Sequence, residues 1–354
     1  MFKEKYPATI RVSFYPYTYV RIMAMKGKLY KRQDYNKLLK MQANEIAKYL
    51  EETEYKGEIN TLAKEYEGYE LVEEALYMNF INNIQKLEEI SSREMGYLLK
   101  VYLRKYEVYN IKTIVRGKAV QQPAQETEKL LLPIGAMNKA KLLKLLEMES
   151  IAAVLKKVGL REQEYKEALA YYEKEGSLLE IENMLDQIWY KEMQKFSMQL
   201  AEEHKLFKGL LQAEIDVMNV KLLLRLKKTG MESKKISQFF FSGGTSFSKS
   251  RCKALAEKDF ETVVSSLQTS AFKSIIENHR AELEKKDLRL FEKSLDVWLL
   301  QKTTLLMHQF PLSVDTLLSY LFAKEIEMRN LRVLVKGKQF NLEEKFIENQ
   351  LVIA

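Results

Sequence analysis

The stretch EVYNIKTIVRGK, at 107–118, occurs three times in this chain with small changes. DVMNVKLLLRLK stands at 216–227 and EMRNLRVLVKGK at 327–338. These first, second and third copies share an acid, an Asn three positions later, and basic residues among aliphatic ones. The same spacing of about 110 residues relates three stretches upstream, which are VEEALY (72–77), IENMLD (181–186) and FEKSLD (291–296). Constant spacing over such a length predicts a threefold internal repeat.

Each repeat is expected to hold a glycine-bearing turn, a shorter helix of the kind written DYNKLLKMQANEIAKYLEE (34–52), and two longer amphipathic helices. The turns contain Gly27, Gly135, and the neighbours Gly243 and Gly244. The connections AVQQPAQETEKLLLPIG (119–135) and GMESKKISQFFFSGGTSFS (230–248) hold much of the Pro, Gly, Ser and Gln, which is typical of boundaries. We therefore expect three similar helical domains, at 1–120, 121–231 and 232–354.

The composition favours helix nearly throughout. Hydrophobic residues make up 46% and charged residues 30%, with only 13 Gly and 5 Pro in 354 residues. Because Gly and Pro disfavour helix most and strand signals are weak, the predicted fold class is all-α. No run approaches the roughly 18 apolar residues of a membrane helix, so we expect no direct bilayer span. Cys252 is the only cysteine, which excludes an intramolecular disulfide.

The net charge of +8 decides little about partners. A nucleic-acid binder more often gathers its Lys and Arg into a basic stripe with interleaved aromatic residues. Here acids and bases are mixed almost everywhere, as in EKDFETVV (257–264). We interpret the charge as a solvated surface and expect no nucleic-acid partner.

In the first copy, Glu107 and Asn110 share the apolar face with Ile111 and Ile114, because helix residues turn by about 100° each. The other copies follow the same geometry with the pairs Asp216 and Asn219, and Glu327 and Asn330. One interpretation is a register device, in which each pair bonds a neighbouring backbone or helix. The alternative is a pair that lines a central concavity or a partner surface. A strong loss of stability in Asn110→Leu favours the register role.

The sequence offers no catalytic residues, no metal ligands and no cofactor site. The histidines His204, His279 and His308 are scattered, without the spacing of a metal site. FSGGTSFSKS (241–250) lacks the G-x-x-x-x-G-K-[ST] spacing of a phosphate loop and follows no strand, so it is interpreted as a turn between repeats. The adjacent Phe239–Phe241 run is interpreted as core, with an exposed patch as the alternative.

Three quoted stretches resemble a known family: YVRIMAMKGKLYKRQDYNKLLKMQANEIAKYLEETEY (19–55), YEVYNIKTIVRGK (106–118) and KEIEMRNLRVLVKGK (324–338). The family is the C subunit of the V/A-type rotary ATPases, whose eukaryotic counterpart is called the d subunit. The similarity runs from about Tyr15 to Gly337. The second copy departs most, since Asp216 replaces Glu and LRLKKTG (224–230) lacks the Gly-Lys of the other copies.

The resemblance implies a mechanical, non-catalytic part of a rotary ATPase rather than an enzyme. Family members form a three-domain helical funnel with pseudo-threefold symmetry on the cytoplasmic face of the membrane rotor ring of proteolipid (c/K) subunits. The D and F shaft subunits enter the funnel, which thereby couples shaft to ring for transport of H⁺ or Na⁺. The glycine-bearing turns would contact a partner at one end. The alternative is a helical scaffold or adaptor protein of another assembly.

Overall fold

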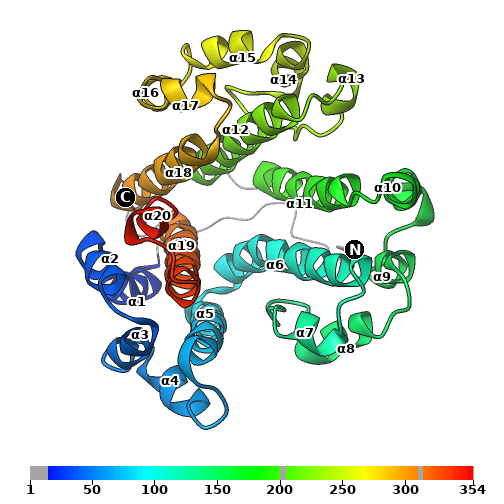
Figure 1. Ribbon diagram of the computed structural model, residues 1–354. Coiled ribbons are helices and arrows are strands. Elements are labelled where there is room, and N and C mark those ends of the chain that lie inside the picture. Colours follow the sequence, from blue (N-terminus) through cyan, green and yellow to red (C-terminus); the bar gives the residue numbers. More distant parts are fainter. Residues whose placement is uncertain (1–14, 200–204, 310–313, 354) are drawn as a thin grey trace. The chain divides into compact units, whose positions relative to one another are not determined.

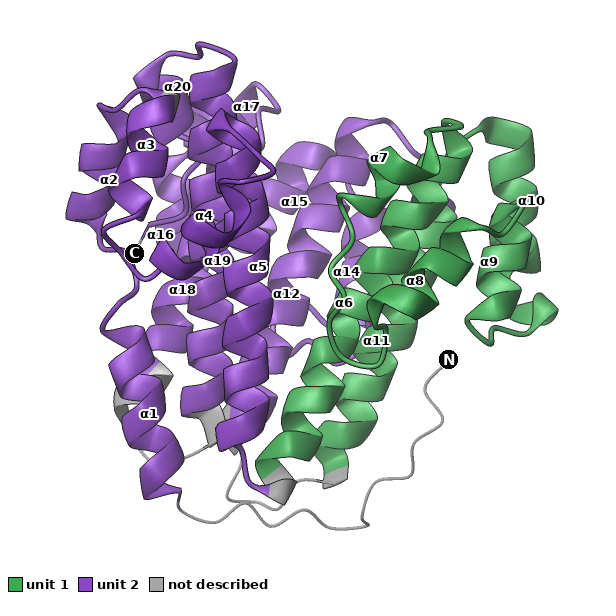
Figure 2. Cartoon of the chain, turned by 90° about the horizontal axis from the view of Figure 1, so that it is seen from below, with its two compact units in different colours: residues 1–11, 93–204 green, residues 12–92, 205–354 purple. Residues whose placement is uncertain are grey.

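The computed structural model describes residues 15–199, 205–309 and 314–353, and within these ranges every regular element is a helix (Figure 1). The prediction of an all-α fold is thereby confirmed for this part of the chain. The residues fall into two compact units, which Figure 2 colours separately. One unit holds 93–199, and the other holds 15–92, 205–309 and 314–353.

The first unit consists of two long helices joined by four short ones. Its helices are α6 (Arg93–Ala119), α7 (Ala124–Glu128), α8 (Lys139–Leu146), α9 (Ile151–Lys157), α10 (Glu162–Glu175) and α11 (Leu179–Gln199). The long helices α6 and α11 pack along each other, and α7, α8 and α9 pack on α6. Leu103, Ile111 and Ile114 of α6 are fully buried, because their spacing places them on one face of the helix.

The second unit contains a similar assembly over 205–309. Its helices are α12 (Lys205–Lys228), α13 (Ser233–Ile236), α14 (Lys249–Ala256), α15 (Phe260–Leu267), α16 (Lys273–Asn278), α17 (Arg280–Glu284) and α18 (Arg289–Gln309). The long helices α12 and α18 pack together, as α6 and α11 do. The Phe239–Phe241 run is 2% exposed or less at each position, which confirms its interpretation as core.

The rest of the second unit joins late and early parts of the chain. It contains α19 (Val314–Gln339) and α20 (Glu344–Glu348) together with α1 (Pro16–Lys26), α2 (Arg32–Leu39), α3 (Ala43–Leu50), α4 (Lys56–Leu62) and α5 (Gly68–Ile90). The long helix α19 packs along α5 and also contacts α1 and α3, while α20 contacts α2. In Figure 1 the red and orange end of the chain accordingly lies against the blue beginning.

Long helices from successive sequence repeats pack on each other. The second long helix of one repeat packs on the first long helix of the next, which gives the pairs α6 with α11, α12 with α18, and α19 with α5. In the third repeat the two long helices, α18 and α19, also pack on each other. Residues on both sides of 120 belong to one compact unit, and so do residues on both sides of 231. The domains 1–120, 121–231 and 232–354 therefore remain a prediction about the sequence repeat. The pairs α6 with α11, α12 with α18 and α19 with α5 each combine helices of two repeats, and two of these pairs belong to one compact unit.

The single helix expected over 34–52 is two helices, α2 and α3. The break falls at Gln42, whose backbone N–H donates to the Glu45 carboxylate at 2.8 Å. An acid three residues into a helix satisfies a backbone donor at the helix start and favours a new N-terminus there. Leu38 on α2 and Ile46 on α3 are both fully buried, so the break lets two short helices direct apolar side chains inward.

Candidate functional site

The three asparagines of the repeat make the same pair of hydrogen bonds. Asn110 Nδ2 donates to the Leu132 carbonyl oxygen at 2.6 Å, and Asn110 Oδ1 accepts from the Leu132 N–H at 2.8 Å. The corresponding pairs are Asn219 with Phe241, at 3.0 and 2.8 Å, and Asn330 with Val352, at 2.7 and 2.8 Å. The partner lies 22 residues further along the chain in every copy. Each asparagine is at most 1% exposed, and its amide ties a following segment to the long helix.

The acid of the second copy binds the segment that follows the glycines. Asp216 is 4% exposed and accepts from the backbone N–H groups of Ser246 at 2.9 Å and Phe247 at 2.7 Å. The Thr245 hydroxyl donates to the same carboxylate at 3.1 Å. This glycine-bearing turn thus directs its N–H groups at a carboxylate of its own chain, which serves as the anion there.

The acid of the third copy binds a segment from the beginning of the chain. Glu327, 2% exposed, accepts from the Tyr30 backbone N–H at 2.6 Å and from the Tyr55 hydroxyl at 2.7 Å. Tyr30 stands three residues after Gly27, as Phe247 stands three residues after Gly244. The third site therefore consists of α19, the early segment around Tyr30 and the late segment around Val352, which lie far apart in the sequence.

The glycines expected at turns lie next to these acids in two copies. A methyl group on Gly244 would overlap Asp216 Oδ1 and stand 2.9 Å from the Phe247 carbonyl oxygen. Gly135 has a φ of +66°, and a methyl group there would stand 3.8 Å from Glu107 Oε1. Glu107 itself is 7% exposed. Gly27 ends α1 with an ordinary helical φ of −59°, and a methyl group there would stand 3.6 Å from the carbonyl oxygens of Met23 and Ala24, away from the acid of its site.

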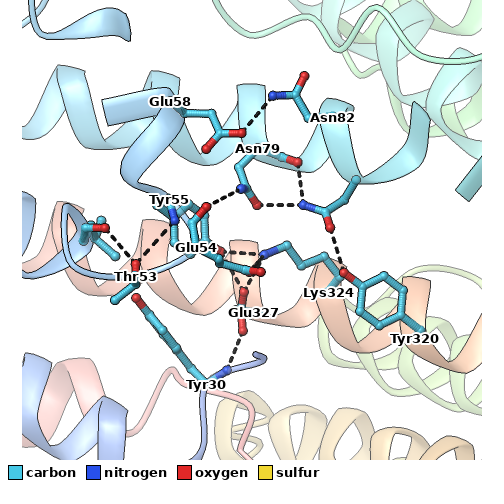
Figure 3. Close-up of polar contacts among 12 residues, drawn as sticks. Tyr30, Thr53, Glu54, Tyr55, Glu58, Asn79, Asn82, Tyr320, Lys324 and Glu327 are labelled. Carbon is cyan, nitrogen blue, oxygen red and sulfur yellow. Dashed lines mark hydrogen bonds and ion pairs between the residues drawn. The ribbon is translucent and has the colours of Figure 1, made fainter. Parts of the chain in front are cut away.

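A buried ammonium group, that of Lys324, lies in the third site (Figure 3). The first copy has Arg104, 6% exposed, at the equivalent position, and the second has Ala213. Lys324 is 1% exposed and lies one helical turn before Glu327, to which its Nζ donates at 2.8 Å. The same Nζ donates to the Tyr55 hydroxyl at 3.0 Å and forms an ion pair with Glu54. Two carboxylates and a phenol thus surround one ammonium group, which offsets the cost of taking these charges out of water.

A chain of buried amides extends from this group toward α5 (Figure 3). The Tyr320 hydroxyl donates to Asn83 Oδ1 at 2.8 Å, and Asn83 Nδ2 donates to Asn79 Oδ1 at 2.9 Å. Asn79 Nδ2 in turn donates to the Glu54 carbonyl oxygen at 3.4 Å. Polar groups on α19 and α5 are therefore linked through their shared interior, where a satisfied network specifies one packing.

Burial changes the acid–base properties of this group. Desolvation raises the pKa of Tyr55 well above its ordinary value, and the charges of Glu327 and Glu54 act in the same direction. Desolvation also raises the pKa of Glu54, while the Lys324 ammonium partly lowers it. The pKa of Tyr320 is likewise raised, first by burial and then by the two carboxylates. The phenols thus stay protonated and able to donate.

Ion pairs join the two long helices of each packed pair. Their basic residues lie on the side of the repeated stretch opposite the acid and the asparagine. Arg116 of α6 binds the Glu182 carboxylate of α11 with two nitrogens at 2.7 and 2.6 Å, and Lys112 binds Asp186 at 2.5 Å. The hydrogen bonds to Glu182 raise the pKa of Arg116. Between α12 and α18 the same pattern consists of Arg225 with Glu292 and Lys221 with Asp296.

The third helix pair uses a modified version of this pattern. Arg332 and Lys336 of α19 both bind the Glu73 carboxylate of α5, at 2.7 and 3.1 Å. Tyr77 stands where the other copies have Asp186 and Asp296, and the Arg332 guanidinium lies 4.6 Å from the centre of its ring. A cation–π contact with Tyr77 thus takes the place of the ion pairs that Asp186 and Asp296 form in the other copies.

The sequence repeat identified the acids and asparagines of these sites but not the residues that they contact. Lys324 could have been found, because a residue three positions before Glu327 shares its helix face. Glu54 and Tyr55 lie in the ETEY stretch that carries the family resemblance, yet nothing in the sequence links them to Glu327, more than two hundred residues away. Only the fold brings these residues together.

Within the described residues no group of three or more His, Cys, Asp and Glu side chains is placed to hold a metal ion. His279 Nε2 forms a 2.7 Å hydrogen bond with the Ser294 hydroxyl. His204 and the side chain of His308 lie outside the described residues. No helix in the described ranges combines the length and apolar character needed to cross a lipid bilayer.

Comparisons with known proteins agree along nearly the whole chain. Residues 18–350 match the model of the ATP synthase (C/AC39) subunit family. The C subunit of the A-type ATP synthase of Methanococcoides burtonii is 33% identical over 342 residues, which cover 96% of this chain and 95% of that protein. The equivalent proteins of Haloferax volcanii and Archaeoglobus fulgidus are each 32% identical, covering 95% of this chain and 97% and 96% of theirs.

Proposed function

Because the chain belongs to the ATP synthase (C/AC39) subunit family, we propose that it is a non-catalytic central-stalk subunit of a V/A-type ATPase or ATP synthase. In this role it couples the D and F shaft subunits to the membrane proteolipid ring, so that rotation links ATP chemistry to transport of H⁺ or Na⁺. It binds the ring peripherally, on the cytoplasmic face. The observation that carries the proposal is the family match over 18–350.

The proposed arrangement is a funnel of three similar helical domains around the rotor axis. Each domain consists of one packed pair of long helices with its short helices. In support of this, all three pairs carry the acid–amide pair on one side and interhelical ion pairs on the other. Equivalent walls suit a part that surrounds an axis.

Torque transfer requires helices that do not slide along each other. The bidentate pairs of Arg116 with Glu182 and Arg225 with Glu292 restrain sliding, because a planar guanidinium holds a carboxylate in one orientation. Their side chains are partly exposed, so each pair contributes on the order of 1 kcal/mol or less to stability. Their proposed value is stiffness rather than stability.

The acid–amide pairs are, in this proposal, register devices. Glu107, Asp216 and Glu327, with Asn110, Asn219 and Asn330, hold the connecting segments at fixed heights along the long helices. The hydrogen bonds of the three asparagines to backbone of their own unit support this role over that of a partner-facing surface. The glycines allow two of these segments to approach the acids.

Co-purification tests the proposal. The tagged chain is co-expressed with the D and F subunits of its own complex and separately mixed with the detergent-solubilised proteolipid ring. We expect a stoichiometric complex with each on size-exclusion chromatography. In membrane vesicles, omission of the chain should abolish ATP-driven ion pumping while the catalytic head continues to hydrolyse ATP.

Two results contradict the proposal. One is failure of the chain to join either the shaft or the ring under conditions in which the two preparations are themselves intact. The other is ion pumping that persists without the chain. A helical adaptor of another assembly would give the first result, and its true partners would have to be sought elsewhere.

A further inference from the structure

The end of α19 carries an apolar groove with a basic edge. The groove has a volume of about 350 Å³ and is lined by α19, α20 and the turn between them. Phe340, Leu342 and Phe346 contribute its apolar side chains and are 67%, 43% and 45% exposed. Three large apolar residues exposed together are unusual on a protein surface and mark interaction sites.

The repeat provides an internal comparison, because the same helix end is built three times. The residues with positive φ that follow the long helices are Gln121, Gly230 and Asn341, each eleven positions after the asparagine of its copy. In every copy the backbone N–H of the following residue donates to a carbonyl oxygen of the long helix. These bonds run from Gln122 to Gly117, from Met231 to Leu226 and from Leu342 to Gly337. The backbone at these ends is therefore equivalent.

Side chains beneath the turn are also equivalent. Thr127, Ile236 and Ile347 are each at most 2% exposed and pack at the helix end. The positions of Phe340, Leu342 and Phe346, by contrast, hold Val120, Gln122 and Glu126 in the first copy and Thr229, Met231 and Lys235 in the second. Since two copies form the same turn with mainly polar residues, folding does not require the apolar groove of the third.

The charges around the groove select the kind of partner. Arg329, Arg332 and Lys336 line it together with the apolar residues. In the described residues they form ion pairs with two carboxylates, those of Asp296 and Glu73, and Asp296 also binds Lys221. The described lining of the groove thus holds three cationic side chains and no acidic one, and the Arg329 and Lys336 side chains remain 45% and 43% exposed. Carboxylates on a partner would complement this edge.

From these observations we propose that the groove binds an amphipathic helix of another subunit, with apolar residues on one face and acids beside them. Its apolar side chains occupy the space between Phe340, Leu342 and Phe346, and its carboxylates bind Arg329 and Lys336. A helix suits a short apolar groove because residues three and four positions apart project from one face. Among the three described helix ends, the third alone has these apolar residues, so the partner binds one side of the molecule and marks one of three otherwise similar walls.

The inference rests on the proposed function for the choice of complex in which it is tested. The double variant Leu342→Gln, Phe346→Glu places first-copy residues on the third copy. We expect it to keep the wild-type unfolding temperature and to join the assembled complex at least about tenfold more weakly, since it loses two buried apolar contacts. Val120→Gln at the first copy is the matched control and should join like wild type.

A photoreactive benzoylphenylalanine at position 346 of the full chain identifies the partner within the purified complex, with position 126 as control. We expect position 346 alone to cross-link, to one segment of another subunit that has an apolar helical face and acids. The variants Arg329→Ala and Lys336→Ala should each weaken assembly several-fold at low salt and less at high salt.

Cross-links from position 346 to a second copy of this chain, to a segment without acids, or to nothing would overturn the inference. So would a double variant that assembles as well as wild type. If the wild-type chain itself fails to enter the complex, the proposed function is wrong, which is a different result and is seen before any variant is examined.

Discussion

The second and third acid–amide sites make similar hydrogen bonds with different parts of the chain. In the second site, Asp216 and Asn219 bind one continuous segment, from Phe241 to Phe247. In the third site, the partners of Glu327 and Asn330 lie at opposite ends of the described chain, at Tyr30 and Val352. The same local chemistry closes a short loop in one place and joins distant segments in the other.

The third site also has buried polar residues that the second site lacks. A short loop is held close to its helix by its own length, so a few hydrogen bonds suffice to fix it. The early segment has no such tether to α19, and a buried ammonium group, two carboxylates and a phenol contact one another there. Charged hydrogen bonds are stronger and more directional than neutral ones, which suits the longer closure.

The largest expected effect is that of Lys324→Met. The substitution leaves the Glu54 and Glu327 carboxylates facing each other with side chains 11% and 3% exposed. We expect the free energy of unfolding of the second unit to fall by about 3–5 kcal/mol, measured by urea denaturation with circular dichroism. Adding Glu54→Gln and Glu327→Gln should restore part of this loss. An unchanged midpoint in Lys324→Met would show that the third site is held by its neutral hydrogen bonds alone.

Substitution of the asparagines tests whether the copies depend equally on the amide that holds the following loop. Asn219→Leu removes three hydrogen bonds, two to Phe241 and one to the Phe247 carbonyl oxygen, whereas Asn110→Leu removes two. Since each buried group left unsatisfied costs about 1–3 kcal/mol, we expect a loss of about 2–4 kcal/mol for Asn219→Leu and a smaller loss for Asn110→Leu. Thermal unfolding measures both. Variants as stable as wild type would instead assign the asparagines to a partner surface.

Gly244→Ala tests the close approach in the second site. The added methyl group would overlap the Asp216 carboxylate, so the loop must shift at a cost of about 1–3 kcal/mol. The control is Gly209→Ala within α12, where a methyl group meets nothing within 4 Å. Helix propensity predicts that this control gains about 0.5–1 kcal/mol. Equal unfolding temperatures for the two variants would contradict the proposed contact.

The smallest expected effect is a pH dependence of the stability that Tyr55 contributes at the third site. The pKa of Tyr55 is raised in the folded protein, so the stability that its hydroxyl contributes is complete below the unfolded pKa of about 10 and is lost as the pH rises through the folded value. The gap in stability between wild type and Tyr55→Phe should therefore shrink by roughly 1 kcal/mol between pH 10 and pH 11. Denaturation at pH 8, 10 and 11 measures the gap. A constant gap would mean that Tyr55 ionises as readily folded as unfolded.

Helical period and repeat spacing predicted much of this architecture. The period places Glu107 and Asn110 on the apolar face, and both are buried. The low content of Gly and Pro predicted an all-α fold, and every regular element in the described residues is a helix. These features are local, since each depends on side chains within a few turns of one helix.

The pairing of long helices from successive repeats could not be predicted, because a repeat fixes a period but not its starting point. Nothing in the residues around 120 distinguishes a domain boundary from a tight turn after α6, where Gln121 has a positive φ of 53°. The contact of Tyr55 with Glu327 spans 272 residues and depends on the pairing of α19 with α5. Such pairings come from tertiary packing, which composition and spacing do not encode in a single sequence.

The closure of the third site also sets the order in which the chain can fold during its synthesis. Asn110 can bind Leu132 once 22 further residues have been synthesised. The Tyr30 N–H, in contrast, can donate to Glu327 only after 297 further residues have been synthesised. At bacterial or eukaryotic elongation speeds this interval is about 15–60 s. The helices made first thus complete their packing among the last. Helix α5 can pack on α3 and α4 early, but its side toward α19 stays exposed on the ribosome until α19 emerges. Chaperones that bind nascent chains should associate with 15–92 far longer than with 93–199.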